Sequence, residues 1–315
     1  MKTAVVLFNL GGPDSLDAVR PFLRNLFSDP AIISLPNPLR WLIAWLISSR
    51  RTKTAQAIYA RIGGKSPLRE LTEAQARALE TQLGGDHRVF VAMRYWHPFA
   101  DEAAQAVKAY EPDRIVLLPL YPQFSRTTTG SSFKDWRRAA MEIGISAPTA
   151  EVRDYPDHPA YVAALAAQLR AALTEAKGQG PFRLLFSAHG LPKKVIDAGD
   201  PYQAQIERTA AAVVAALGID AEGLDWRVCY QSRVGPLEWI GPPTDDEIKR
   251  AGEEKRGLVV LPIAFVSEHS ETLVELDIEY RELADHAGVP FYIRVPALGT
   301  DDGFIAALAD LVGRA

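Results

Sequence analysis

The stretch LLPLYPQFS, Leu117–Ser125, decides the fold because a second version of it, VLPIAFVSE, stands at Val260–Glu268. Another pair of segments repeats in the same order, YVAALAAQL at Tyr161–Leu169 and FIAALADLV at Phe304–Val312. Self-similarity along a chain indicates a duplicated architecture. The sequence therefore predicts two similar domains.

Short β-rich runs alternate with amphipathic stretches along both halves, which is the pattern of parallel α/β sheets. The predicted strands are Thr3–Asn9, Arg88–Tyr95, Arg114–Leu120 and Ala150–Tyr155, then Phe182–Ala188, Trp226–Gln231, Gly257–Phe265 and Phe291–Val295. We predict an α/β fold of two doubly wound, Rossmann-like domains, each with a four-stranded parallel sheet, that face a central cleft. The boundary is expected in EAKGQGP, Glu175–Pro181, which gives domains 1–176 and 177–315, with the last helix free to pack back on the first half.

Charge and cysteine content exclude several classes of protein. The 315-residue chain has a formal net charge of −4, whereas a nucleic-acid surface needs a concentration of basic residues, so no nucleic acid is expected as a partner. Its one cysteine, Cys229, excludes an intrachain disulfide and an iron–sulfur cluster held by cysteines of one chain. No secretory signal precedes the first predicted strand, so a cytoplasmic protein is expected.

Two glycine-rich segments invite a nucleotide-binding interpretation, and their spacing argues against it. Gly11-Gly12-Pro13 lacks the G-x-G-x-x-G spacing, and proline follows Gly63–Ser66 where a phosphate-binding loop begins its helix. Tight turns explain both segments better, so no nucleotide is expected.

One apolar segment, PLRWLIAWLI at Pro38–Ile47, is too short and too interrupted by charge to cross a bilayer. At helical spacing its leucines and isoleucines form one stripe with Trp41 and Trp45 on the flanks, and Arg50 and Arg51 close the predicted helix. Such a helix can pack in the core, line an apolar pocket or touch a membrane. A peripheral contact at the inner face of the membrane stays open beside the other two roles.

A histidine stands where a ligand site is expected. His189 ends the apolar run RLLFSAH, Arg183–His189, and is followed by Gly190. Ligands of open α/β sheets bind outside the carboxyl ends of the strands. This position makes His189 a candidate for catalysis or metal binding, with a structural role as the alternative.

A series of glutamates follows the third predicted strand of the second half: Glu268, Glu271, Glu275, Glu279 and Glu282. On an ideal α-helix their spacings of three and four place them along one stripe. A solvated face is the ordinary alternative, but the stripe begins beside a strand expected to be central, so we expect Glu271 to face His189. One imidazole with carboxylates and no thiolate suits Fe(II), Mn(II), Co(II) or Zn(II), and does not suit Cu(I).

Longer motifs occur in order along the chain: NLGGP at Asn9–Pro13, RIGGKSPL at Arg61–Leu68, LYPQFSRTTTGSS at Leu120–Ser132, FSAHGLP at Phe186–Pro192, QSRVGPLEWIGP at Gln231–Pro242 and FVSEHSETLVELDIEY at Phe265–Tyr280. Together they make the chain resemble the ferrochelatases over essentially its whole length. The resemblance implies two similar chelatase-type domains. It also implies a lyase that inserts Fe(II) into protoporphyrin IX, forming protohaem and releasing two protons, as the final step of haem biosynthesis.

The resemblance also implies roles for single residues. The histidine of SAHGLP carries over to His189 and the glutamate of H-x-E-T-L to Glu271, as the pair that meets the metal and the macrocycle. Metal ligation and proton removal stay open between the two. Glu275 and Glu279 are expected to relay a proton away.

A porphyrin is a large apolar disc with anionic propionates, so its pocket is expected to be aromatic with cations at one rim. Arg50 and Arg51 are candidates for the propionates because a guanidinium matches a carboxylate. Candidates for the walls are Trp41, Trp45, Tyr59, Tyr95, Tyr121 and Trp239, with core packing as the alternative for each.

The chain departs from those members of the family that hold an iron–sulfur cluster. Such members have a cysteine in the Y-P-Q region and an additional carboxyl-terminal segment, whereas Arg126 follows Ser125 here and the chain stops at Ala315. We therefore expect no cofactor, with porphyrin and ferrous iron as the partners. A coproporphyrin ferrochelatase, a chelatase for another tetrapyrrole and a non-catalytic porphyrin or haem carrier stay open as alternatives.

Overall fold

The computed structural model describes residues 1–218 and 223–315 and contains two compact units. Unit 1 comprises Met1–Asp154 with Leu308–Ala315, and unit 2 comprises Tyr155–Ala307. The predicted boundary at 176/177 differs from this division because helix α6, Pro159–Lys177, packs against strands of unit 2. The last helix, α11, Asp302–Arg314, begins in unit 2 and ends in unit 1.

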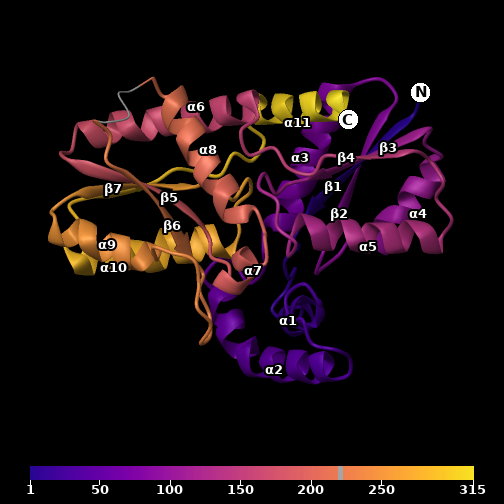
Figure 1. Cartoon of the computed structure of the whole chain (residues 1–315), viewed down its shortest axis with the longest axis horizontal. Helices are drawn as coiled ribbons and strands as arrows, with labels where there is room; N and C mark the ends of the chain where they lie inside the picture. Colours follow the sequence, from indigo (N-terminus) through magenta and orange to yellow (C-terminus); the bar gives the residue numbers. More distant parts are fainter. Residues whose placement is uncertain (219–222) are drawn as a thin grey trace. The chain divides into compact units, whose positions relative to one another are not determined.

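Unit 1 is built on a parallel sheet with the strand order β2-β1-β3-β4 (Figure 1). Its strands are β1, Thr3–Asn9, β2, His87–Met93, β3, Arg114–Pro119, and β4, Thr149–Glu151. The central strand β1 is buried along its whole length, and its Val5 pairs with Val89 on one side and Val116 on the other. A parallel strand covered on both faces is a continuous apolar run, which is why AVVLF needs no polar alternation.

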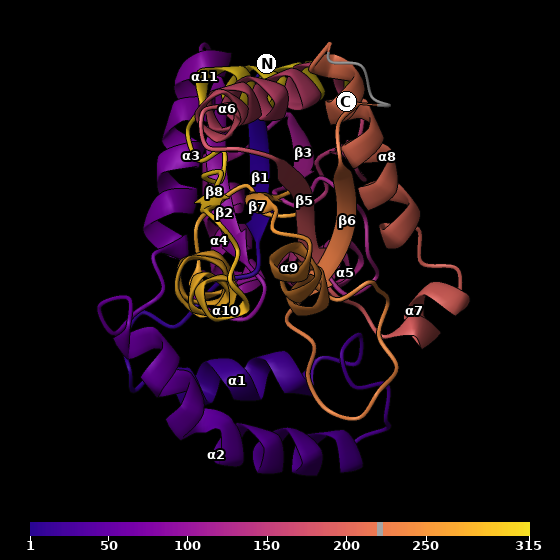
Figure 2. The same cartoon turned by 90° about the vertical axis from the view of Figure 1, so that its left-hand side faces the viewer.

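Helices cover both faces of this sheet. Helix α3, Leu68–Leu83, lies on one face, and α4, Ala100–Tyr110, and α5, Thr129–Glu142, lie on the other (Figures 1 and 2). Helices α1, Val19–Ser28, and α2, Leu39–Ala60, pack side by side.

Unit 2 repeats the design with the strand order β6-β5-β7-β8, again all parallel. Its strands are β5, Phe182–His189, β6, Trp226–Gln231, β7, Gly257–Pro262, and β8, Tyr292–Arg294. The matching order of the two sheets confirms the predicted duplication and the predicted α/β class.

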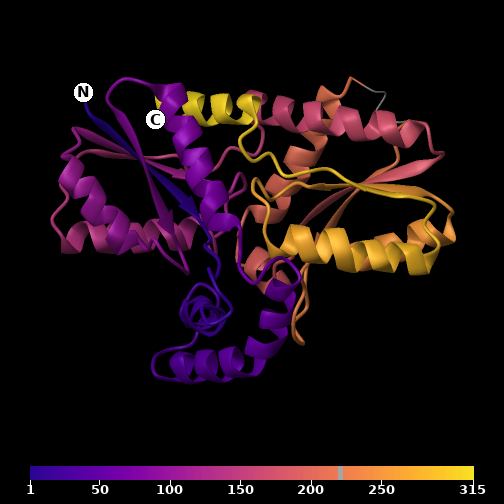
Figure 3. The ribbon, with the colours of Figure 1, turned by 180° about the vertical axis from the view of Figure 1, so that it is seen from behind.

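The helices of unit 2 also form two layers. Helices α6 and α8, Tyr202–Ala216, lie on one face of the sheet, and α9, Thr244–Glu253, and α10, Tyr280–Ala287, lie on the other (Figure 3). The short helix α7, Lys193–Asp197, follows β5. After β7 comes a π-helix, η1, Glu271–Glu279, which continues directly into α10.

Helix α2 differs from the helix that the sequence predicted. It continues past Arg51 to Ala60, and its buried side chains include the small residues Ala44 and Ser48 in place of the leucine stripe. Small residues on the packed face let α2 approach the bulky side chains of α1, so its large apolar side chains stay at the surface. None of the helices within the described ranges combines the length and the apolar character that a membrane span requires.

Candidate functional site

The site of unit 2 lies where the strand order of its sheet reverses. Strand β5 has β6 on one side and β7 on the other, and in such sheets ligands bind outside the carboxyl ends of the strands at this point. His189 is the last residue of β5, and Glu271 is the first residue of η1, which follows β7. The fold therefore brings together two side chains that are 82 residues apart in the sequence.

His189 and Glu271 form a hydrogen-bonded pair. The distance from His189 Nδ1 to Glu271 Oε2 is 2.8 Å, and their side chains are 37% and 30% exposed. The expectation that Glu271 faces His189 is confirmed. Because Nδ1 is engaged with the carboxylate, Nε2 is the ring nitrogen left for a proton or a ligand.

Neighbouring charges shift the pKa values of His189 and Glu271 in opposite directions. Burial lowers the pKa of an imidazole, but the carboxylates of Glu271 and then Glu275 outweigh burial, so the pKa of His189 is raised from its ordinary value. Burial raises the pKa of Glu271, but the imidazoles of His189 and His269 and the Ser232 hydroxyl together lower it to about 2. Glu271 is thus an anion at neutral pH, and a proton that reaches the pair resides on His189.

Residues at the end of β6 connect this pair to Glu275. The Ser232 hydroxyl donates to Glu271 Oε2 at 3.2 Å and also contacts Glu275 Oε2, while the Ser232 amide donates to Glu275 Oε1 at 2.8 Å. Gln231 donates through Nε2 to the Glu271 carbonyl and to Glu275 Oε2, at 3.0 Å each. Burial and the neighbouring Glu271 carboxylate raise the pKa of Glu275, so the carboxylate farther from His189 is the one that accepts a proton more readily.

The acidic stripe is shorter than the sequence predicted. Of the predicted stripe, Glu271 and Glu275 share the site. Residues 271–279 form a π-helix with i→i+5 hydrogen bonds, so the later glutamates do not lie on the same face as they would in an α-helix. Glu268 precedes η1 and pairs with Arg294 instead. Glu279 and Glu282 are exposed.

The sequence analysis missed His269, Ser232 and Tyr202. His269 lies two residues before Glu271, and its Nδ1 accepts the Glu271 amide hydrogen at 3.1 Å. The Tyr202 hydroxyl donates to the His189 carbonyl at 3.0 Å and so holds the end of β5 in place. The spacing H-x-E was a signal that could have identified His269, and Ser232 directly follows the predicted strand Trp226–Gln231 within a quoted motif, whereas nothing in the local sequence indicated Tyr202.

Trp239 is the one predicted wall residue in unit 2, and it lies beside the catalytic candidate. Residues Pro192 and Trp239 form a β-bridge, and the Trp239 ring lies against the backbone of Gly190, the residue after His189. A Cβ at Gly190 would meet the Gln231 carbonyl oxygen at 3.0 Å and Trp239 Cε3 at 3.3 Å. The close approach of the Gln231 carbonyl oxygen, and then of the indole, therefore favours glycine at this turn, because an added Cβ would have to displace them.

Comparison with known proteins identifies the family of this chain. The family model described as Ferrochelatase matches residues 2–315. A ferrochelatase of Phenylobacterium zucineum is 59% identical over 315 residues, which cover 98% of this chain and 90% of the relative. A ferrochelatase of Caulobacter vibrioides is 57% identical over 323 residues, which cover 100% of this chain and 91% of the relative. The chain belongs to the ferrochelatase family. It is therefore an enzyme, in the lyase class that inserts a metal into a porphyrin.

Solved structures outside the ferrochelatases share the fold. SirB from Bacillus subtilis, solved with Fe3+, has a TM-score of 0.57 at 13% identity, with 100% of this chain and 95% of that chain covered. The sirohydrochlorin chelatase SirB of the subspecies spizizenii, in complex with cobalt, has a TM-score of 0.55 at 11% identity, with the same coverage. At such identities the likeness concerns the fold alone, and it confirms the chelatase-type architecture.

The other substrate-binding candidates all lie in unit 1. Trp41 and Trp45 of α2 are 55% and 46% exposed, and Arg50 and Arg51 are exposed on the same helix. Tyr59 and Tyr95 are buried in one core cluster with α1, and the Tyr95 hydroxyl donates to Asp29 at 2.9 Å. Tyr59 and Tyr95 therefore pack in the core, which was the alternative to a place in the pocket wall. Tyr121 packs against the core cluster between the sheet and α5.

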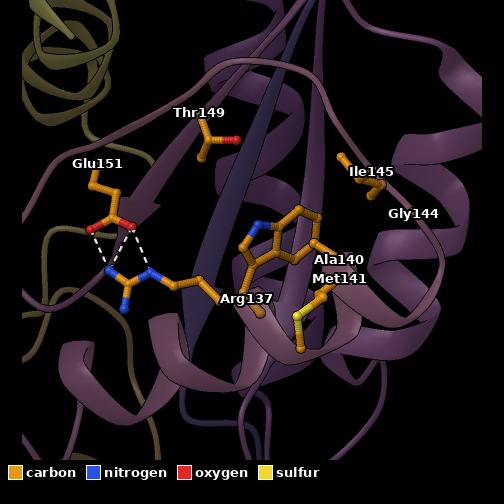
Figure 4. Close-up of a pocket in the computed structure, with 8 residues that line it drawn as sticks. Arg137, Ala140, Met141, Gly144, Ile145, Thr149 and Glu151 are labelled. Carbon is orange, nitrogen blue, oxygen red and sulfur yellow. Dashed lines mark hydrogen bonds and ion pairs between the residues drawn. The ribbon is translucent and has the colours of Figure 1, made fainter.

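A surface hollow of unit 1 is separate from every candidate residue. It has a volume of about 450 Å³ and lies between α5 and β4, with Trp136, Met141 and Ile145 among its lining residues. Figure 4 shows the ion pair of Arg137 and Glu151 at its edge, where Arg137 Nη2 contacts both carboxylate oxygens at 2.6 Å. Since the Glu151 carboxylate is paired with Arg137 and none of the lining residues is a predicted site residue, we assign no part of the reaction to this hollow.

Proposed function

We propose that this enzyme inserts ferrous iron into protoporphyrin IX and that His189 and Glu271 carry out the reaction. The observation that carries the proposal is the partly exposed pair itself, with Nδ1 and Oε2 2.8 Å apart at the strand-order reversal of unit 2. The porphyrin loses its two pyrrole N–H protons as Fe(II) binds to the four nitrogens. The products are protohaem and two protons.

In this proposal His189 accepts the first pyrrole proton through Nε2. The Glu271 carboxylate stabilises the resulting imidazolium, which is the same interaction that raises the pKa of His189. Before it accepts that proton, the neutral imidazole of His189 forms with the Glu271 carboxylate a nitrogen–oxygen donor set that suits Fe(II) as the incoming substrate.

The Glu271 carboxylate accepts the second pyrrole proton and passes it to Glu275 through the hydrogen bonds that connect the two side chains. The Ser232 hydroxyl contacts both carboxylates, and the raised pKa of Glu275 makes it the readier acceptor. Glu279 ends η1 at an exposed position, from which a proton passes to water. This arrangement supports a relay of Glu275 and Glu279 away from the site.

Within unit 2, Trp239 beside Gly190 is proposed to contact the macrocycle. Within unit 1, α2 offers Trp41 and Trp45 as aromatic contacts for a porphyrin, with Arg50 and Arg51 as partners for its propionates. Exposed aromatic and cationic side chains on one helix match an apolar disc that has anionic groups at one edge.

We also propose that the protein works in the cytoplasm and touches the inner face of the membrane peripherally. The exposed face of α2 combines Leu39, Leu42 and Leu46 with two tryptophans, and arginines follow within the next turns. Tryptophan and arginine are the side chains that favour the level of the lipid headgroups.

An anaerobic assay with purified protein tests the function. Fe(II) is supplied with protoporphyrin IX in one arm and with coproporphyrin in the other, and the spectrum of the metallated product is followed. Faster turnover of protoporphyrin is expected. Faster turnover of coproporphyrin would assign the enzyme to that substrate, and porphyrin binding without turnover in both arms would favour a carrier.

A further inference from the structure

Arg294, the last residue of β8, connects the two sides of the π-helix. Its Nε donates to Asp277 Oδ1 at 2.7 Å and its Nη2 to Asp277 Oδ2, so the guanidinium holds this carboxylate with both arms of its fork. Its Nη1 donates to Glu268. Asp277 lies in the last turn of η1, whereas Glu268 precedes η1 by three residues. One side chain thus ties together the entry and the exit of the segment that contains Glu271 and Glu275.

The contact is protected and reinforced. The Arg294 side chain is only 10% exposed, and water therefore competes weakly for its hydrogen bonds. Glu268 also accepts the Ala297 amide hydrogen at 2.9 Å, which fixes the chain after β8. The hydroxyl of Tyr292, two residues before Arg294, donates to the Leu276 carbonyl of η1 at 3.0 Å.

A π-helix needs such support. The i→i+5 pattern is rare, and where it occurs it is often found at functional sites. If residues 271–279 rewound as an α-helix, each carbonyl would bond one residue earlier, and Asp277 and Glu275 would both rotate about the helix axis. Asp277 would then leave the fork of Arg294, and Glu275 would leave the Ser232 amide, to which it is bound at 2.8 Å. The Arg294 contacts and the π-helical form therefore depend on each other.

We propose that Arg294 is a positioning residue for metal insertion, which holds η1 in the form that keeps Glu271 and Glu275 together on Ser232. This inference rests on the proposed roles of His189 and Glu271. Arg294 contacts neither of these two residues directly, and it acts through the path of the η1 backbone.

Arg294→Gln is the variant that tests the inference, and Arg183→Gln is its matched control. Arg183 is also a buried arginine of the unit 2 sheet, with 4% of its side chain exposed, and it binds Asp225 and Glu254 at 3.0 and 2.8 Å. It stands at the start of β5, whereas the site lies at the carboxyl end of that strand. Both variants lose a buried ion pair, so both are expected to lower the melting temperature.

Only Arg294→Gln is expected to impair the reaction of the folded enzyme. Its kcat should fall by about tenfold or more, because small displacements of reacting groups have large effects on rate, while KM for the porphyrin stays within about twofold. Arg183→Gln should retain the wild-type kcat once the folded fraction is corrected for. Asp277→Asn should reproduce the Arg294→Gln loss, and the double variant should be no worse than either single variant.

The inference fails if Arg294→Gln keeps the wild-type kcat, or if its loss equals that of Arg183→Gln at the same folded fraction. A His189→Ala variant, measured in the same assay, distinguishes a failure of the role proposed for His189 from a failure of the role proposed for Arg294. Activity in His189→Ala would overturn the proposed role of His189 in the reaction. An inactive His189→Ala beside a fully active Arg294→Gln would overturn only the role of Arg294.

Discussion

At the scale of single residues, His189 and Glu271 divide the work because their surroundings shift them in opposite directions. Glu271 is held as an anion by two imidazoles, and His189 is made a stronger base by two carboxylates. Neither side chain would have these properties alone in water. The pair therefore combines a neutral imidazole that takes the first proton with a carboxylate that stabilises the imidazolium formed.

Replacing His189 by Ala should abolish turnover and leave porphyrin binding intact. We expect a loss of roughly 10²–10⁴-fold, the usual contribution of a general base. Porphyrin should still quench tryptophan fluorescence, because apolar contact holds the ring. His286→Ala, at an exposed histidine of α10, is the control. Wild-type turnover by His189→Ala, or loss of its circular dichroism signal, would contradict the assignment.

The pH dependence follows from the same shifts. If the reaction needs neutral His189, kcat falls as the pH drops through the pKa of this residue, which lies above the ordinary ~6.5 because of the Glu271 carboxylate. Glu271, with a pKa of about 2, stays ionised throughout that range and adds no further loss. The profile of kcat between pH 5 and pH 9, on the order of the window in which histidines titrate, tests this. A flat profile on the acid side would exclude His189 as the base.

Gly190 offers a test of how tightly the site is held. In Gly190→Ala the new Cβ would press on the Gln231 carbonyl oxygen at 3.0 Å and on the Trp239 ring. We expect about 1–3 kcal/mol of destabilisation and a clear loss of activity, because the displaced backbone adjoins His189. Gly178→Ala, where the nearest atom is 3.6 Å away, should change neither. Denaturant unfolding and the iron-insertion assay together measure both effects.

The sequence predicted His189 and Glu271 but not the residues that surround them. A histidine at a strand end and a glutamate after a central strand follow from the topology rule for α/β sheets. Ser232 and Tyr202 belong to other segments of the fold, and their contacts with the pair depend on tertiary packing. Buried tyrosines such as Tyr95 and exposed tryptophans such as Trp41 have the same aromatic character in a sequence, so their burial could not be read from it.

At the scale of helices and strands, periodicity was a good guide to strands and a poor guide to η1 and α2. Strands β1 and β6 have the predicted ends because their apolar runs stop abruptly. The i→i+5 winding of η1 has no periodic signature, since its glutamates fit an α-helix equally well. For α2 the sequence left core packing, a pocket wall and a membrane contact open, and the structure buries Ala44 and Ser48 and leaves the leucines exposed.

The exposed face of α2 should bind anionic membranes weakly. We expect wild-type protein to float with vesicles that contain anionic lipid, and the double variant Trp41→Ser and Trp45→Ser to lose most of this binding. High salt and carbonate should release the bound protein, because the apolar face is too small for permanent insertion. Met141→Ser, which changes a 76% exposed side chain on α5, is the control and should bind as the wild type does. Equal flotation of the tryptophan variant would rule out this face.

At the scale of the whole molecule, duplication explains why the two units have the same strand order. The acid–base pair described above lies in unit 2, because the two units carry different side chains at equivalent positions. The sheets β2-β1-β3-β4 and β6-β5-β7-β8 match, so the two strand-order reversals are equivalent positions. Strand β1 ends in Asn9 and β5 ends in His189 at these positions. A duplicated fold thus offers equivalent positions, and the side chains at them decide which one performs proton transfer.

Helix α6 decides where unit 2 begins, and fragments with and without this helix test that boundary. A fragment of residues 155–307 keeps α6, whose Tyr161, Leu165, Leu169 and Leu173 are buried, whereas a fragment that starts at the boundary predicted from the sequence, residues 177–307, lacks this helix. Without α6 the sheet would expose the apolar face that packs against it, and each buried leucine is worth about 1.5–3 kcal/mol. We therefore expect the longer fragment to unfold cooperatively in a thermal melt and the shorter one to aggregate or to show no transition. Matching cooperative transitions in the two fragments would mean that α6 contributes little to unit 2, and the boundary would then move back toward residue 176. A longer fragment that is folded should also retain the His189–Glu271 pair, since both residues and all their hydrogen-bond partners described above belong to unit 2.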